Sequence, residues 1–219
     1  MEKPWDIEGK WSISHWGYKD EIRKTMPLLP KKVGLRDVTF REGDDCVGYL
    51  VSIEDKIEML RLAVEMGVEE IDIGGPSMHQ HQFDFGVAVQ KSGLKVRTTG
   101  RFFANNTKDY KRDVDMCVAA GSTNIRIVLM YLNEETIYNQ LKVFPKMVEY
   151  CHSVGKEVTW GISDMPRASL ELAMKVYKEG NDCGADRAMI MDTFGVANSA
   201  TMKFLASKIR EVIGPNKKR

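Results

Sequence analysis

Short runs of β-branched and apolar residues alternate with stretches of helical periodicity along most of the chain. The helical stretches place apolar residues on one face, as Ile57, Leu60 and Val64 do at intervals of three and four. Ser52, followed three residues later by Asp55, is typical of a helix start. The β-rich runs recur at intervals of about 30 residues and begin near Val33, Val68, Lys95, Asn124, Lys156 and Asp186.

This repeat predicts six βα units in a row. Strands that are each followed by a helix form a parallel sheet, so the fold class is α/β. Two architectures fit at this point, a doubly wound open sheet and a (β/α)8 barrel. No GxGxxG motif follows any of the runs, which disfavours a dinucleotide-binding sheet.

Residues 1–30 lack the repeat. They hold three of the four tryptophans and end in the run Pro27-Leu28-Leu29-Pro30. We interpret them as an N-terminal extension that packs on a surface or on another subunit, and residues 31–219 as the domain that carries the βα units.

Composition narrows the class of protein. Hydrophobic residues make up 43% of the chain and charged residues 29%, as in ordinary globular proteins. The net charge of +1 gives no broad basic face, so we expect no nucleic-acid partner. No apolar run approaches the about 20 residues that span a membrane, and no secretory leader is evident. Because the four cysteines form no CxxC pair, we expect a reduced, cytoplasmic protein.

Charged residues gather where the β-rich runs end, and in parallel α/β folds these ends carry the functional side chains. Carboxylates there suit a hard divalent cation, and arginines suit an anionic substrate or charge that develops on an oxygen. Salt bridges at the end of a barrel would explain any one of these segments, but their recurrence favours a site. The segments are Asp37–Asp45, Asp72–Pro76, Thr99–Arg101, Ser163–Arg167 and Asp192–Gly195.

The run Asp37-Val38-Thr39-Phe40-Arg41-Glu42-Gly43 resembles the first-strand signature of the DRE-TIM metallolyases, also called the HMGL-like or pyruvate carboxyltransferase domain family. Later segments resemble the family's motifs on strands two, three, five and six, in order: residues 67–72, 100–101, 163–167 and 184–195. The resemblance covers about residues 31–215. It implies a TIM (β/α)8-type barrel that is incomplete, with about six βα units present.

The resemblance also implies roles for five residues. Glu42 resembles the acidic ligand of a divalent metal, which would be Mg2+, Mn2+ or Zn2+. Arg41 resembles the arginine that stabilises the enolate or the 2-oxo group, and Asp72 stands where the family has a glutamate that orients this arginine. Thr193 resembles the residue that hydrogen-bonds the carboxylate of a 2-oxoacid, and Arg101 is a further candidate for binding that carboxylate.

The family includes homocitrate synthase, 2-isopropylmalate synthase, citramalate synthase and HMG-CoA lyase. The resemblance therefore implies a metal-dependent enzyme that condenses an acyl-CoA, such as acetyl-CoA, with a 2-oxoacid. The pair Arg41-Glu42, in place of Arg-Asp, favours homocitrate-synthase-like members. Two alternatives stay open: a carbon–carbon lyase like HMG-CoA lyase, and a non-catalytic interaction protein that keeps a relict site.

The sequence departs from the family in ways that bear on function. The family takes its remaining metal ligands from an H-x-H-N-D run on strand seven, and this sequence stops before such a strand. We therefore expect a fragment or one subunit of a split enzyme, either a homo-oligomer or bound to a partner chain that completes the barrel. Asp45 stands where the family commonly has glutamine, so the choice of substrate is open.

Two further patterns have simple structural interpretations. The run His79-Gln80-His81 is an H-x-H motif, but it follows the second strand, so we interpret it as a loop or helix start rather than a metal site. The methionines at positions 130, 189 and 191 alternate in the predicted strands, and we interpret them as barrel core.

Overall fold

The computed structural model describes residues 6–12, 14–25 and 33–214. The chain divides into two compact units, Met1–Gly34 and Leu35–Arg219, which are described separately. The predicted boundary between residues 30 and 31 lies outside the described residues and stays a prediction.

The first unit consists of short elements. Strands β1 (Asp6–Ile7) and β2 (Trp11–Ser12) form an antiparallel hairpin, with Gly9 in the left-handed conformation at φ +72°. A 3-10 helix η1 (His15–Tyr18) and helix α1 (Asp20–Lys24) follow. No residue of this unit whose side chain the structure describes is buried, so these elements have no hydrophobic core of their own.

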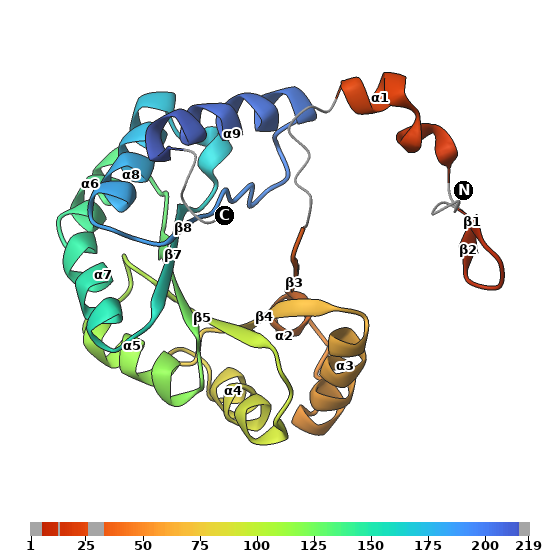
Figure 1. Ribbon diagram of the computed structural model, residues 1–219. Helices are drawn as coiled ribbons and strands as arrows, with labels where there is room; N and C mark the ends of the chain where they lie inside the picture. The colour runs from red at the N-terminus through yellow and green to blue at the C-terminus, as the bar shows by residue number, and fades with distance from the viewer. Residues whose placement is uncertain (1–5, 13, 26–32, 215–219) are drawn as a thin grey trace. The chain divides into compact units, whose positions relative to one another are not determined.

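The second unit is built on one parallel sheet of six strands. The strands lie side by side in the order in which they occur in the sequence. A doubly wound sheet would reverse this order at a switch point, so the unbroken order identifies the winding of a barrel. Figure 1 shows that the sheet curls into a half-barrel. The strands are β3 (Leu35–Asp37), β4 (Val68–Gly74), β5 (Arg97–Phe103), β6 (Asn124–Leu129), β7 (Glu157–Ile162) and β8 (Arg187–Ala188).

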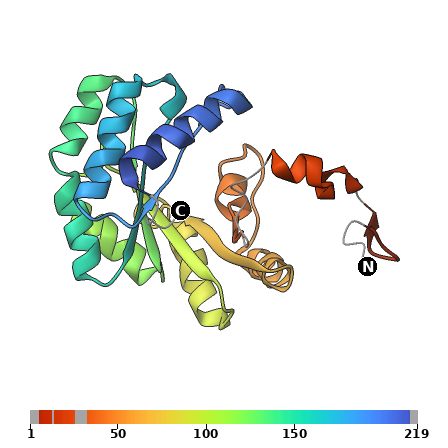
Figure 2. The same cartoon turned by 45° about the horizontal axis from the view of Figure 1, so that its top comes forward.

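Helices cover the outer, convex face of this sheet, and none of the described helices of this unit lies on the concave face (Figures 1 and 2). Ser52 caps the first covering helix as predicted, because its Oγ accepts the backbone N–H of Asp55 at 3.1 Å. The short helices α2 (Thr39–Asp44) and η2 (Met165–Arg167) follow β3 and β7. The covering helices are α3 (Ile53–Glu65), α4 (Gln80–Ser92), α5 (Tyr110–Ala119), α6 (Glu134–Leu141), α7 (Phe144–Ser153), α8 (Leu170–Asp182) and α9 (Ser199–Ile213).

The two faces of the sheet differ in polarity. Alternate residues of each strand point outward and pack against the helices, and in β6 these are Ile125, Ile127 and Leu129, all fully buried. The residues between them, such as Asn124 and Arg126, point to the concave face. The hydrophobic core therefore lies between sheet and helices, and the concave face is free to carry charged groups.

Two predicted strands are shorter in the structure than in our sequence analysis. The run from Val33 to Phe40 forms only the three-residue strand β3, and Asp37 then accepts the backbone N–H of Thr39 at 2.7 Å as α2 begins. At the other end of the sheet, β8 covers only Arg187 and Ala188. Within the described sheet both strands pair on one side only, so fewer ladder hydrogen bonds hold them extended.

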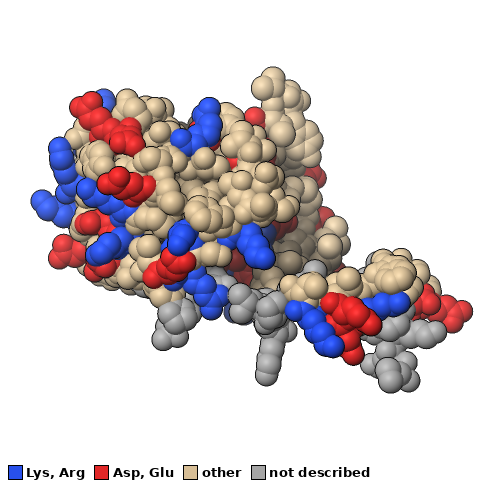
Figure 3. Space-filling model, turned by 90° about the horizontal axis from the view of Figure 1, so that it is seen from above, with Lys and Arg blue, Asp and Glu red and all other residues tan. Residues whose placement is uncertain are grey.

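The surface carries both signs of charge. On the face seen in Figure 3, acidic and basic side chains are interspersed. Within the described part of the chain, no helix is both long enough and apolar enough to cross a membrane.

Candidate functional site

A cavity of about 700 Å³ lies at the carboxyl ends of the strands. Arg41 and Glu42 of α2 line one side of it, and Thr193, beyond β8, lines the other. Arg101 of β5 lies between them. Four of the five predicted site residues therefore line one cavity. The fifth, Asp72, is fully buried and lies outside the lining.

Arg41 is held between carboxylates. Its guanidinium forms an ion pair with the neighbouring Glu42, and its Nη1 donates to Asp45 at 3.2 Å. Its Nε lies 3.7 Å from the Oδ2 of the buried Asp72. The Arg41 side chain is 15% exposed and that of Glu42 is 53% exposed, so the arginine faces inward and the glutamate faces solvent.

Asp72 has a different main partner from the one we expected. Its Oδ2 lies 2.5 Å from Nη2 of Arg126 and 3.3 Å from Nη2 of Arg36, and its Oδ1 accepts the backbone N–H of Gly74. The contact to Arg41 is a longer ion pair without a hydrogen bond. An aspartate is one methylene shorter than the glutamate that the resemblance implies at this position.

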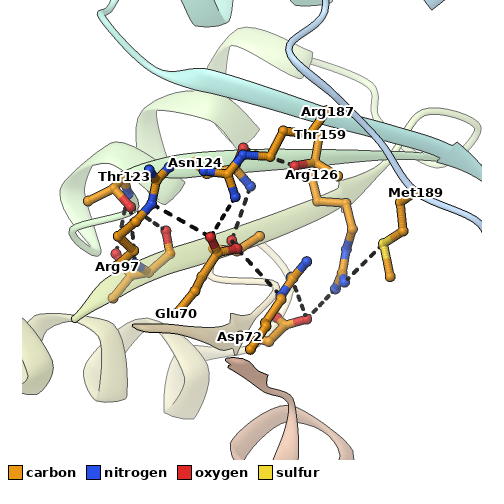
Figure 4. Close-up of polar contacts among 12 residues, drawn as sticks. Glu70, Asp72, Arg97, Thr123, Asn124, Arg126, Thr159, Arg187 and Met189 are labelled. Carbon is orange, nitrogen blue, oxygen red and sulfur yellow. Dashed lines mark hydrogen bonds and ion pairs between the residues drawn. The ribbon is translucent and has the colours of Figure 1, made fainter. Parts of the chain in front are cut away.

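A second charged layer lies deeper on the concave face, around Glu70 (Figure 4). Its carboxylate accepts hydrogen bonds from Thr99 Oγ1 at 2.7 Å and from Arg187 Nη1 at 2.6 Å. Burial alone would raise the pKa of Glu70, but these two hydrogen bonds and the positive charges of Arg187 and Arg36 together outweigh it and hold the pKa below its ordinary value. Arg187 also donates to Glu157 at 2.7 Å, so the layer is a connected network of ion pairs.

Arg101 adds a further positive charge to the cavity. Burial lowers its pKa to about 10, and repulsion from Arg41 and Arg126 contributes to this shift. Its nearest carboxylate is Asp45, at 3.8 Å from Nη2. Three guanidiniums therefore lie within electrostatic reach of one another at the cavity, and an anion bound there would relieve their repulsion.

Thr193 lies directly beside a strained segment of the cavity wall. Its Oγ1 accepts the backbone N–H of Asp164 at 2.8 Å, which leaves the hydroxyl proton for a ligand. Asp164 has φ +54°, the only positive value among the described residues other than glycine. Its carboxylate is held by Arg167, whose Nε donates at 2.5 Å. Strained residues of this kind concentrate at binding sites.

The described residues do not by themselves fit a divalent metal. No group of three or more His, Cys, Asp or Glu side chains that could hold one lies within the described segments. Glu42 offers one exposed carboxylate, but that carboxylate is paired with Arg41. Asp192, which also lines the cavity, accepts the backbone N–H groups of Val196 and Ala197 at 3.0 Å each. A metal role for Glu42 stays a prediction.

The interpretation of His79-Gln80-His81 as a helix start is confirmed. His79 is the N-cap residue of α4, and His81 lies in its first turn. The Nε2 of His81 lies 4.0 Å from Asp44. The interpretation of the methionines is wrong, because Met130, Met189 and Met191 lie beyond the ends of their strands and line the cavity, half-buried.

Sequence reasoning missed Arg126, Arg36, Glu70 and Arg187, which build the charged layers. A signal for them exists in the alternation within the strands. In Asn124–Leu129 and Glu157–Ile162 every second residue is apolar and the residues between are largely polar. Such alternation in a sheet that helices cover on one face predicts a polar second face.

The fold and the cavity define a protein of the β/α-barrel class, with charged side chains at the carboxyl ends of its strands. The HMGL-like family model matches residues 32–218, and the chain belongs to this family.

Curated relatives include synthases. The chain is 29% identical over 195 residues to a probable 2-isopropylmalate synthase of Ignicoccus hospitalis, covering 84% of this chain and 47% of the relative. It is 29% identical over 192 residues to the homocitrate synthase AksA of Methanopyrus kandleri, with the same coverage. The chain therefore spans about half the length of the curated relatives it matches.

Solved structures share the fold. An HMG-CoA lyase from Brucella melitensis matches with a TM-score of 0.64 at 14% identity, over 84% of this chain and 69% of the other. A monomeric dihydrodipicolinate synthase variant matches with a TM-score of 0.58 at 12% identity, over 82% of this chain and 59% of the other. At these identities the likeness concerns the fold alone.

Proposed function

We propose that this chain takes part in a carbon–carbon bond-forming reaction between an acyl-CoA and a 2-oxoacid. The observation that carries the proposal is the cavity at the strand ends, where Arg41, Arg101 and Thr193 face a space large enough for a small substrate. Membership of the HMGL-like family and the similarity to 2-isopropylmalate and homocitrate synthases support it.

In such a condensation, the α-carbon of the thioester loses a proton and attacks the 2-oxo carbon. Negative charge then develops on the former 2-oxo oxygen, which takes up a proton, and water hydrolyses the thioester to release CoA. Arg41 is suited to stabilise the developing charge, because Glu42, Asp45 and Asp72 hold its guanidinium from several sides. A preorganised donor of this kind contributes about 10²- to 10³-fold to the rate.

In this proposal, Arg101 and Thr193 bind the carboxylate of the 2-oxoacid. Arg101 supplies a buried positive charge that stays protonated at neutral pH, since its pKa is about 10. The Thr193 hydroxyl can donate across the cavity, because its oxygen already accepts from Asp164. The resemblance to the family supports Glu42 as one ligand of a divalent metal, which would polarise the 2-oxo oxygen when bound.

The test is release of CoA from acetyl-CoA in the presence of Mg2+ or Mn2+, a panel of 2-oxoacids and a partner chain that completes the barrel. We expect release that depends on the 2-oxoacid, and a loss of about 100-fold in the Arg41→Lys variant, because lysine cannot keep the forked contacts. Arg61→Lys is the matched control, since Arg61 is 55% exposed on α3 and its ion pair is with Glu58, one turn away on the same helix. Release without a 2-oxoacid, or full activity in Arg41→Lys, would contradict the proposal.

A further inference from the structure

Tyr131 supplies a hydroxyl group at the wall of the cavity. It follows the last residue of β6 by two positions, lines the cavity and is half-buried. Its ring packs against the hydrophobic core, and its hydroxyl has no hydrogen-bond partner among the described residues. The phenolic oxygen is not enclosed by protein, so a ligand in the cavity can reach it.

Hydrogen bonds hold the backbone at this side chain. The N–H of Tyr131 donates to Ser163 Oγ at 3.0 Å. The preceding residue, Met130, is held by the buried Gln140, whose Oε1 accepts its N–H at 2.8 Å and whose Nε2 donates to its C=O at 2.9 Å. A fixed position suits a group that transfers a proton, because such a group must lie within hydrogen-bond reach of the reacting atom.

Tyr131 lies close to the proposed carboxylate site. Ser163, which accepts its backbone N–H, is followed by Asp164, and the N–H of Asp164 donates to Thr193 Oγ1 at 2.8 Å. The two side chains are therefore connected through adjacent residues of one segment. In a 2-oxoacid the 2-oxo carbon is bonded directly to the carboxylate carbon, so a carboxylate bound at Thr193 brings the 2-oxo oxygen toward Tyr131.

The other groups of the cavity are poorly suited to give up a proton. Its described lining holds no histidine, lysine or cysteine. Glu42 and Asp164 pair with arginines and Asp192 accepts two backbone N–H groups, so these carboxylates act as acceptors. Arg101 would hold its proton more tightly with a carboxylate beside it, because an anion favours the charged form. The aliphatic hydroxyls are far weaker acids than a phenol, which leaves the phenol as the proton donor.

A cation lies near this phenol. The pKa of Arg167 is raised chiefly by its hydrogen bond with Asp164, and electrostatic interaction with Tyr131 adds to this rise. The guanidinium carbon of Arg167 also lies 4.7 Å from the centre of the Phe194 ring, and both side chains line the cavity. A positive charge in this position stabilises the phenolate that remains after proton transfer.

We propose that Tyr131 is a catalytic residue, the general acid that protonates the former 2-oxo oxygen. This inference rests on the proposed function and adds the proton donor to it. As the carbon–carbon bond forms, the electron pair of the 2-oxo C=O bond moves onto the oxygen. The O–H bond of Tyr131 then breaks, and its proton joins that oxygen to give the hydroxyl group of the product. The phenolate takes a new proton from water, so each turnover leaves the residue unchanged.

The experiment separates this step from the one that precedes it. The full chain is assayed with a partner chain that completes the barrel, Mg2+, acetyl-CoA and a 2-oxoacid that supports CoA release. We expect Tyr131→Phe to lower kcat for CoA release by about 100-fold, and to change KM for the 2-oxoacid by less than about threefold. Tyr138→Phe is the matched control and should keep full release, because Tyr138 lies on α6 outside the cavity lining.

The second readout is exchange of the acetyl hydrogens of acetyl-CoA for deuterium in D2O, followed by mass spectrometry. Oxamate replaces the 2-oxoacid here, because it has a carboxylate and a carbonyl oxygen but accepts no carbon nucleophile. Loss of the α-proton precedes protonation of the oxygen, so Tyr131→Phe should keep the exchange rate of the unmodified protein. A substitution that merely disturbs the cavity would lose both reactions.

The outcomes separate this inference from the proposed function. Full CoA release by Tyr131→Phe, or loss of exchange together with release, overturns the role of Tyr131 and leaves the condensation standing. If the unmodified protein releases no CoA with any 2-oxoacid, both proposals are wrong. Should Tyr131→Phe fail to fold, 3-fluorotyrosine at position 131 decides the question. Its more acidic phenol should lower the pH above which CoA release declines, and an unchanged pH profile overturns the inference.

Discussion

At the scale of single residues, the concave face of the sheet is organised by two carboxylates. Asp72 forms ion pairs with the guanidiniums of Arg36 and Arg126. Glu70 forms ion pairs with those of Arg36 and Arg187. Each carboxylate lowers the cost of burying positive charge, and each would be costly to bury alone. The arginines at the cavity therefore depend on partners that lie deeper in the sheet.

Replacing Glu70 by glutamine tests this dependence. The amide cannot neutralise Arg187, so we expect Glu70→Gln to lower the free energy of unfolding at pH 7 by about 3 kcal/mol, measured by urea unfolding. Glu70 has a folded-state pKa below its ordinary value of 4.5. Its carboxylate therefore stabilises the fold above about pH 4.5, and this contribution is lost as the pH falls through the lowered pKa.

The stability difference between the unmodified chain and Glu70→Gln should accordingly shrink as the pH is lowered below about 4.5. Glu171→Gln, at an exposed position in α8, serves as the control and should change stability by less than about 0.5 kcal/mol. A pH-independent difference would show that Glu70 acts through packing and not through its charge.

One general rule let the sequence predict which of the candidate site residues lie close together. Arg41, Glu42, Arg101 and Thr193 follow or end strands of a parallel sheet, and such ends meet at one edge. The contact between Asp72 and Arg126 could not be predicted in this way. It joins β4 to β6 across the intervening β5, so it depends on the curl of the sheet and on side-chain length.

At the scale of elements, α2 departs most from the sequence-based expectation. The run that resembles the family's first-strand signature was predicted to lie at the end of a strand, but residues Thr39–Asp44 form a helix. This helix carries Arg41 and Glu42, so its position sets the geometry of one side of the cavity. Its last residue, Asp44, forms an ion pair with Lys56 of α3, whose side chain is 2% exposed.

Removing this ion pair should loosen α2. We expect Lys56→Met to lower the free energy of unfolding by about 3 kcal/mol, because it leaves the carboxylate of Asp44 without its cation. The double variant Lys56→Met with Asp44→Asn should recover at least about 1 kcal/mol of this loss, since no uncompensated charge remains. Hydrogen exchange at the α2 amides should accelerate in Lys56→Met more than exchange in β6.

The control for this prediction is Lys178→Met, because Lys178 is 68% exposed and pairs with Asp182 on the surface of α8. Its effect on stability should stay within about 0.5 kcal/mol. A double variant no more stable than Lys56→Met would show that the buried methylene chain of Lys56 matters, not its charge.

At the scale of the whole molecule, the repeat of strand and helix predicted the parallel sheet, and the order of the strands established the barrel winding. The repeat alone left two architectures open, because periodicity predicts the elements and not which strands are neighbours. The family resemblance implied an incomplete barrel, and the strand order confirms it. The family match begins at residue 32. Every buried hydrophobic residue among those described lies between Phe40 and Ile209. The buried core therefore belongs to the second unit alone.

A chain that lacks residues 1–31 should consequently keep the fold of the second unit. No described side chain before residue 34 is buried, so the deletion removes little apolar area from the folded state. We expect the melting temperature to change by less than about 2 °C, which corresponds to about 0.5 kcal/mol for a domain of this size. The far-UV circular dichroism per residue should be retained as well. A fall of more than about 8 °C would contradict this prediction and show that the first unit stabilises the barrel.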